Sequence, residues 1–72
     1  MQMVMESHID GAFHGWPGRG AFRLVNGQVW EQAEYKYSYH YAYRPKATVW
    51  SDGGSYYLEV EGMRDTVRVR RR

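Results

Sequence analysis

The chain has 72 residues, no cysteine, twelve aromatic residues and a formal net charge of +2. This length predicts one domain over residues 1–72, and the lack of cysteine excludes a disulfide framework and a thiolate metal site. No apolar run approaches the ~20 residues of a transmembrane helix, and residues 1–5 do not resemble a secretory signal peptide. We therefore expect a cytoplasmic protein without membrane contact. Because so short a chain has a small core, oligomerisation is the expected source of added stability.

The positive charge is concentrated at the basic C-terminal end, residues 68–72, where four of five residues are arginine. Without these five residues the net charge becomes negative, so the body of the domain is not basic. We interpret the last strand as an edge strand that its charge protects from aggregation, in preference to a phosphate-binding tail.

Turn signals divide the chain into short extended segments. A first strand is predicted within residues 3–13, and a loop is predicted at residues 15–20 because glycines around a proline disfavour both helix and central strand. A hairpin turn is predicted at residues 26–27 and another at residues 52–54. The remaining predicted strands are residues 21–25, 28–34, 47–51, 55–61 and 66–70, and residues 35–43 are predicted to continue the strand 28–34 in extended form, as a strand or strand edge.

Five or six short strands without helical periodicity predict an all-β fold, specifically a small antiparallel SH3-like barrel. A barrel of the OB type is the second choice, because that fold usually needs more residues and a helix. Alternation along the last two strands predicts that Leu58, Val60, Val67 and Val69 point into the core.

The turn at Asn26-Gly27 leaves the register of its hairpin open. A two-residue loop exposes Trp30, whereas a three-residue loop with Gly27 in a bulge pairs Phe22 with Trp30 and buries the indole. In both cases Phe22 and Leu24 share a face. One slipped residue exchanges the faces of all the side chains, so both registers remain possible at this point.

Five of the seven tyrosines occupy alternate positions in residues 35–43. In a strand their rings share one face, and so small a core cannot satisfy five buried hydroxyls. The alternative is a bent strand that divides the tyrosines between core and surface. We predict a binding module that forms homo-oligomers through this face. The predicted interface or ligand-binding residues are Tyr35, Tyr37, Tyr39, Tyr41, Tyr43, Trp30, His40 and Arg44, with Trp16 and Trp50 as further candidate anchors.

Other functions find less support. Lys36, His40 and Arg44 beside the tyrosines suggest a binder of single-stranded nucleic acid, although the body of the domain is acidic. Ser38 and His40 lack an orienting acid, and the histidine spacings match no metal motif. We therefore predict no catalytic residue, no metal and no cofactor. An enzyme remains possible only as an oligomer whose chains share a central site.

The centre of the chain carries the motif Asn26-Gly27-Gln28-Val29-Trp30, followed by the tyrosine segment and residues 41–46. Over most of residues 11–70 the chain resembles a family of small uncharacterised bacterial proteins that occur as integron gene-cassette products of the mobile metagenome. This resemblance implies a compact, mostly β domain and supplies no catalytic residue. The plasmid-borne type II dihydrofolate reductases are also SH3-like barrels that share a central site, but their Val-Gln-Ile-Tyr motif is absent here.

Overall fold

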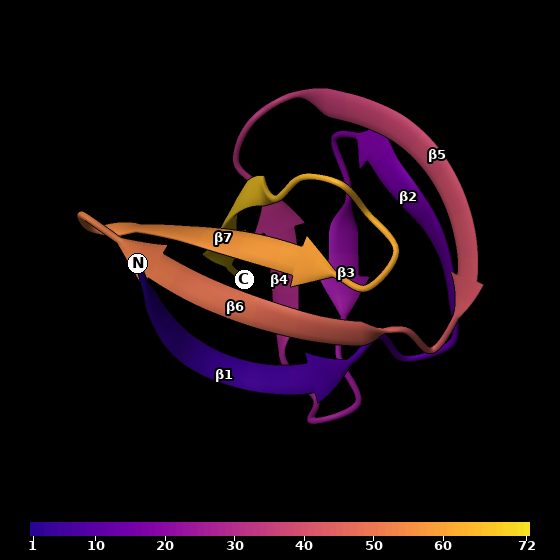
Figure 1. Cartoon of the computed structure of the whole chain (residues 1–72), viewed down its shortest axis with the longest axis horizontal. Helices are drawn as coiled ribbons and strands as arrows, with labels where there is room; N and C mark the ends of the chain where they lie inside the picture. Colours follow the sequence, from indigo (N-terminus) through magenta and orange to yellow (C-terminus); the bar gives the residue numbers. More distant parts are fainter.

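A computed structural model describes all 72 residues and contains eight strands and no helix (Figure 1). The strands are β1 Gln2–His8, β2 Ala12–Gly18, β3 Ala21–Arg23, β4 Val29–Gln32, β5 Lys36–Tyr43, β6 Lys46–Asp52, β7 Ser55–Val60 and β8 Val67–Arg71. All pairings are antiparallel. The all-β prediction is confirmed. There is no helix long and apolar enough to cross a membrane.

Two sheets make up the fold. Six strands form one sheet in the order β1-β6-β7-β8-β4-β3, and β2 and β5 form a separate pair. The two edges of the larger sheet meet at a single bridge between Ile9 and Leu24, next to a hydrogen bond from Asp10 N to Arg23 O of 2.9 Å. The sheet is therefore strongly curved, but its strands do not form a closed barrel.

The N-terminal third differs from the sequence prediction, because residues 2–18 form two strands and the predicted loop at residues 15–20 lies largely within β2. Gly11, with φ of 93°, lies at the turn between β1 and β2. Gly15 and Gly18 also have positive φ, and the register of β2 shifts between Phe13 and Gly15. A strand with only one neighbour tolerates such a bulge, and it also tolerates Pro17, which lacks an N–H group.

The core is a single cluster to which every strand except β1 and β5 contributes a buried side chain. Aromatic rings from both sheets meet within it: the Trp16 ring lies 5.7 Å from those of Phe13 and Phe22, in edge-to-face geometry. The predicted inward residues of β7 and β8 are all buried. The twelve core residues are Ile9, Phe13, Trp16, Phe22, Leu24, Trp30, Ala47, Val49, Leu58, Val60, Val67 and Val69.

The β3–β4 hairpin adopts the bulged register. Phe22 pairs with Trp30, and the N–H of Leu24 donates to Gln28 O at 2.9 Å. Gly27 has φ of 92°, the left-handed conformation that this loop requires. This register points Trp30 into the core, where it is 4% exposed.

Two expected surface anchors are therefore core residues. Trp16 is fully buried and Trp30 nearly so, which makes the prediction of Trp30 as an interface residue wrong. Only Trp50 remains partly exposed among the three tryptophans. A core of twelve residues needs large side chains to fill its volume, and the two buried indoles supply them.

Truncation of Leu58, which is 0% exposed, should destabilise the domain. Leu58→Ala is expected to lower the free energy of unfolding by about 2–5 kcal/mol, since it leaves a cavity in the core. Urea unfolding followed by tryptophan fluorescence measures this loss. Val4→Ala, at a position 47% exposed in β1, is the matched control and should change stability little. Equal losses in the two variants would contradict the assigned core.

Candidate functional site

The clearest candidate for a functional surface is one side of β5, which we name the tyrosine face. It consists of Tyr37, Tyr39, Tyr41 and Tyr43 of β5 together with Tyr35, the residue directly before the strand. Alternation along an extended strand brings these rings to the same side, and each is 54–69% exposed. No tyrosine hydroxyl forms a hydrogen bond within the chain. The predicted stripe is present, and its five hydroxyls are free to bond to another molecule.

The neighbouring strand β2 leaves this face uncovered. The two strands run side by side at the right of Figure 1. Gly15 pairs with Tyr39 and Pro17 with Tyr37, and the His14 ring lies 5.4 Å from that of Tyr41. Most β2 side chains beside the phenol rings are small, so the rings stand above their surroundings. The β2 residues that border the tyrosine face are Ala12, His14, Gly15, Pro17 and Gly18.

Asp65, in the loop between β7 and β8, joins both strands of the small sheet to the larger one. Its carboxylate accepts a 3.0 Å hydrogen bond from Trp16 Nε1 of β2 and pairs with Lys36 Nζ of β5 at 3.3 Å. Lys36 Nζ also donates to Thr66 O at 2.7 Å. The hydrogen bond from Trp16, and then the Lys36 ammonium, lower the pKa of Asp65. Asp65 thus holds β2 and β5 in place from the side opposite the tyrosine face.

His40 does not join the tyrosine face. It lies half-buried against the β7–β8 loop, so close that a side chain on Gly62 would come within 2.6 Å of His40 Nε2. No hydrogen bond links His40 to Ser38. Arg44, by contrast, is exposed directly after Tyr43 and has φ of 52°. The structure therefore places Arg44 at the end of the tyrosine face and packs His40 beneath it.

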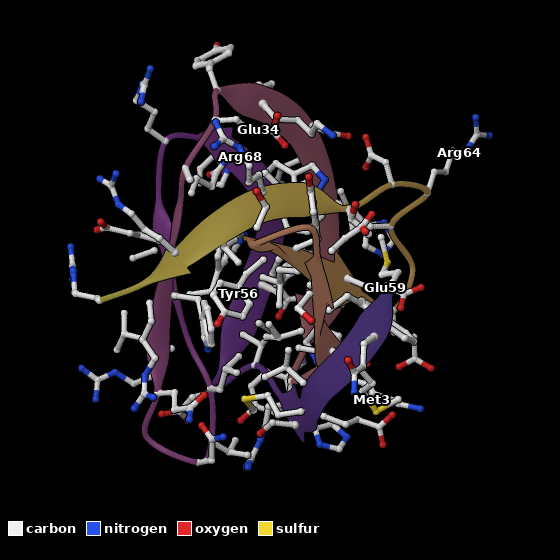
Figure 2. The ribbon with its side chains drawn as sticks, turned by 90° about the vertical axis from the view of Figure 1, so that its left-hand side faces the viewer. Met3, Glu34, Tyr56, Glu59, Arg64 and Arg68 are labelled. Carbon is white, nitrogen blue, oxygen red and sulfur yellow. The ribbon has the colours of Figure 1, made fainter.

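Three of the four arginines at the C-terminal end, Arg68, Arg70 and Arg72, have partners within the chain. Glu31 of β4 accepts from Arg70 Nε at 2.6 Å and lies 3.5 Å from Arg72 Nε. The hydrogen bond from Arg70 and the charge of Arg70, followed by the charge of Arg72, lower the pKa of Glu31. Arg68 and Glu34 lie together at the top of Figure 2, where the Arg68 N–H donates to the Glu34 carboxylate at 2.7 Å.

The interpretation of the last strand as an edge strand is wrong. β8 lies between β7 and β4 within the six-stranded sheet. The order of short strands in a sheet cannot be read from an all-β sequence, so the prediction rested on the arginine-rich composition alone. In the structure β8 pairs with β7 on one side and with β4 on the other, so it is not an edge strand.

Sequence reasoning missed a second feature, a pocket of about 410 Å³ on the outer side of β1, β6 and β7. Thr48 is one of its lining residues. Alternation along β6 predicts that Thr48 points outward, because Ala47 and Val49 on either side of it point into the core. The pocket depends on the pairing of β1 with β6, whose residues are more than forty positions apart. No group of three or more His, Cys, Asp or Glu residues is arranged to hold a metal ion.

Substitution of Gly15 should disrupt the small sheet. An added Cβ would collide with the Ser38 carbonyl oxygen of β5, so Gly15→Ala is expected to weaken the β2–β5 pairing. Gly54→Ala is the matched control, because Gly54 has nearly the same positive φ but open space around it. Amide hydrogen exchange should therefore accelerate in β5 for Gly15→Ala only. If amide exchange accelerated equally in the two variants, the cause would be the positive φ and not the contact between β2 and β5, and the prediction would be wrong.

The ionised Asp65 should make stability depend on pH. Its pKa is lowered by folding, so its contribution is fully present above the ordinary aspartate pKa of about 4 and is lost as pH falls through the lowered value. The melting temperature of the wild type should therefore fall more steeply below pH 4 than that of Asp65→Asn. Parallel melting curves across pH 2–6 would show that the Asp65 charge contributes nothing.

Neither a protein-family model, nor a curated protein, nor a solved structure matches this chain. Function is therefore inferred from the surfaces of the domain. Of the ten large hydrophobic side chains that are exposed, five form the tyrosine face, which makes it the leading candidate for a contact surface.

Proposed function

We propose that this protein is a small binding module that self-associates through the tyrosine face into a homodimer or a higher oligomer. The observation that carries the proposal is the exposure of all five rings on one side of β5. Phenol rings that remain exposed to solvent contribute little to the stability of a folded monomer. A second copy would bury their apolar rings and leave the hydroxyls at hydrogen-bonding distance from new partners.

The area available fits such an interface. A tyrosine side chain buries roughly 150–250 Å² when it is fully enclosed. At the exposures of the tyrosine face, the five rings offer on the order of 500–800 Å². A standard protein interface buries about 800 Å² on each partner. The tyrosines with their β2 neighbours therefore approach what one stable contact needs.

The charge distribution also favours a protein partner. The β2 and β5 side chains on this face include no lysine, arginine or carboxylate, so two copies meet without strong like-charge repulsion. Arg70 and Arg72 are paired with Glu31 in the other sheet. This pairing weakens the case for a nucleic-acid surface, which needs several free cations along the rings, whereas here Arg44 stands at one end of the tyrosine face.

Two further parts of the proposal rest on the sequence. The protein acts in the cytoplasm, consistent with the absence of cysteine, and it is related to the small integron-cassette proteins that the motif at residues 26–30 resembles.

Removal of a central ring should weaken self-association. Tyr39→Ser and Tyr41→Ser are each expected to raise the dimer dissociation constant about tenfold, because an interface tyrosine often contributes more than 1 kcal/mol. Sedimentation velocity over a wide concentration range measures this constant.

Tyr57→Ser on β7 and Arg71→Ala on β8 are the controls, since both lie outside the tyrosine face and should leave the constant unchanged. A wild-type protein that stays monomeric at about 1 mM, or a Tyr39→Ser protein that assembles like the wild type, would refute the proposal.

A further inference from the structure

The pocket around Thr48 lies on the six-stranded sheet, away from the strand pair that carries the tyrosine face. Three side chains form a row across its floor. Thr48 of β6 pairs with Glu6 of β1 on one side and with Glu59 of β7 on the other. Neighbouring strands lie about 4.8 Å apart, so the backbones of two glutamates flank that of Thr48, one on each side at one strand spacing.

Thr48 is in an unusual position for an outward residue. It is only 6% exposed, although Ala47 and Val49 on either side point into the core and Thr48 therefore points outward. Its side chain forms no hydrogen bond within the chain. Longer side chains around the pocket bury it, so an unpaired hydroxyl lies at the pocket floor.

Apolar groups form the ends of the pocket. Met3 pairs with Trp50 across β1 and β6, and Met63 lies in the loop after β7. Trp50 Nε1 donates to Glu59 Oε1 at 2.9 Å, which fixes both the indole and one of the two flanking carboxylates. Met3 and Glu59 lie on the same side of the molecule in Figure 2, although they come from opposite ends of the chain. The indole face and two thioethers suit an alkyl chain and favour a nearby positive charge.

The charge of the pocket is negative. Glu6, Glu59 and Glu61 line it against one cation, Lys46, whose Nζ lies 3.1 Å from Glu6. An anion would therefore be repelled, and a cation would be attracted. Within the chain, the Lys46 ammonium group already forms an ion pair with the Glu6 carboxylate, as a bound ammonium would.

We infer that this pocket binds a primary ammonium group carried on an apolar stem, as in a free alkylamine or a lysine side chain. The three N–H donors of an ammonium match the three oxygen acceptors of the floor, on Glu6, Thr48 and Glu59. A quaternary ammonium has no donor, and a planar guanidinium suits a single carboxylate better than a row of three acceptors. The stem then lies against Trp50 and the two methionines.

The test is an NMR titration of the isotope-labelled protein with n-butylammonium chloride at constant ionic strength. Shifts should concentrate at the Thr48 amide and the Trp50 indole, with a dissociation constant on the order of 1–10 mM, as befits a ligand of five heavy atoms. Tetramethylammonium should bind at least about tenfold more weakly, because it cannot donate to the floor. Butyrate should not bind.

Matched variants separate the site from general charge effects. Thr48→Val removes the hydroxyl and keeps the branched shape, so affinity should fall about 3–10-fold, whereas Thr48→Ser should retain it. Glu59→Gln should weaken binding about tenfold. Asp10→Asn removes the same charge outside the pocket and should change nothing. Lys46→Met frees Glu6 and should tighten binding about 3–10-fold, a gain that loss of folding cannot imitate.

The source of the ammonium group is distinguished by a second probe, a lysine residue blocked at both ends. Tighter binding than butylammonium assigns the pocket to a lysine side chain of a protein, and weaker binding assigns it to a free amine. The inference is overturned if butylammonium at 100 mM causes no localised shifts, if Thr48→Val binds as the wild type does, or if Asp10→Asn loses as much affinity as Glu59→Gln.

Discussion

The position of β2 is the constraint on which the rest of this domain depends. Phe13 and Trp16 extend from it into the core, so the strand is held by buried aromatic contacts as well as by its pairing with β5. The Trp16 indole N–H then reaches Asp65, whose carboxylate also pairs with Lys36 of β5. One buried ring therefore fixes the small sheet to the large one and indirectly orients every tyrosine on β5.

The exposure of the tyrosines follows from the limits of a 72-residue core. The interior is filled by twelve side chains, and the only residues with polar atoms among them are the two tryptophans, whose N–H groups donate to Asp65 and Gln28. Five more hydroxyls would each need a buried partner, at a cost of several kcal/mol if unpaired. The tyrosine rings therefore destabilise the fold least on the outward side of a strand pair, where water can bond to their hydroxyls. A second molecule can also reach them there.

Local patterns predicted what depends on local geometry. Alternation correctly assigned the tyrosine stripe and the inward Leu58 and Val60, and the Asn26-Gly27 turn correctly limited the hairpin to two registers. Features set by distant pairing were not predictable. The proline and glycines of β2 suggested a loop because the free edge of a two-stranded sheet, which tolerates them, is invisible in the sequence. The Thr48 pocket likewise needs three strands in register.

β5 contributes no side chain to the hydrophobic cluster, although it is the longest strand of the domain. Its outward positions are consequently free to change during evolution without loss of the fold, provided that the backbone still pairs with β2. Such a division allows a stable scaffold to exchange one recognition surface for another by substitutions in a single short segment. A library randomised at those five positions would sample new binding specificities on an unaltered framework.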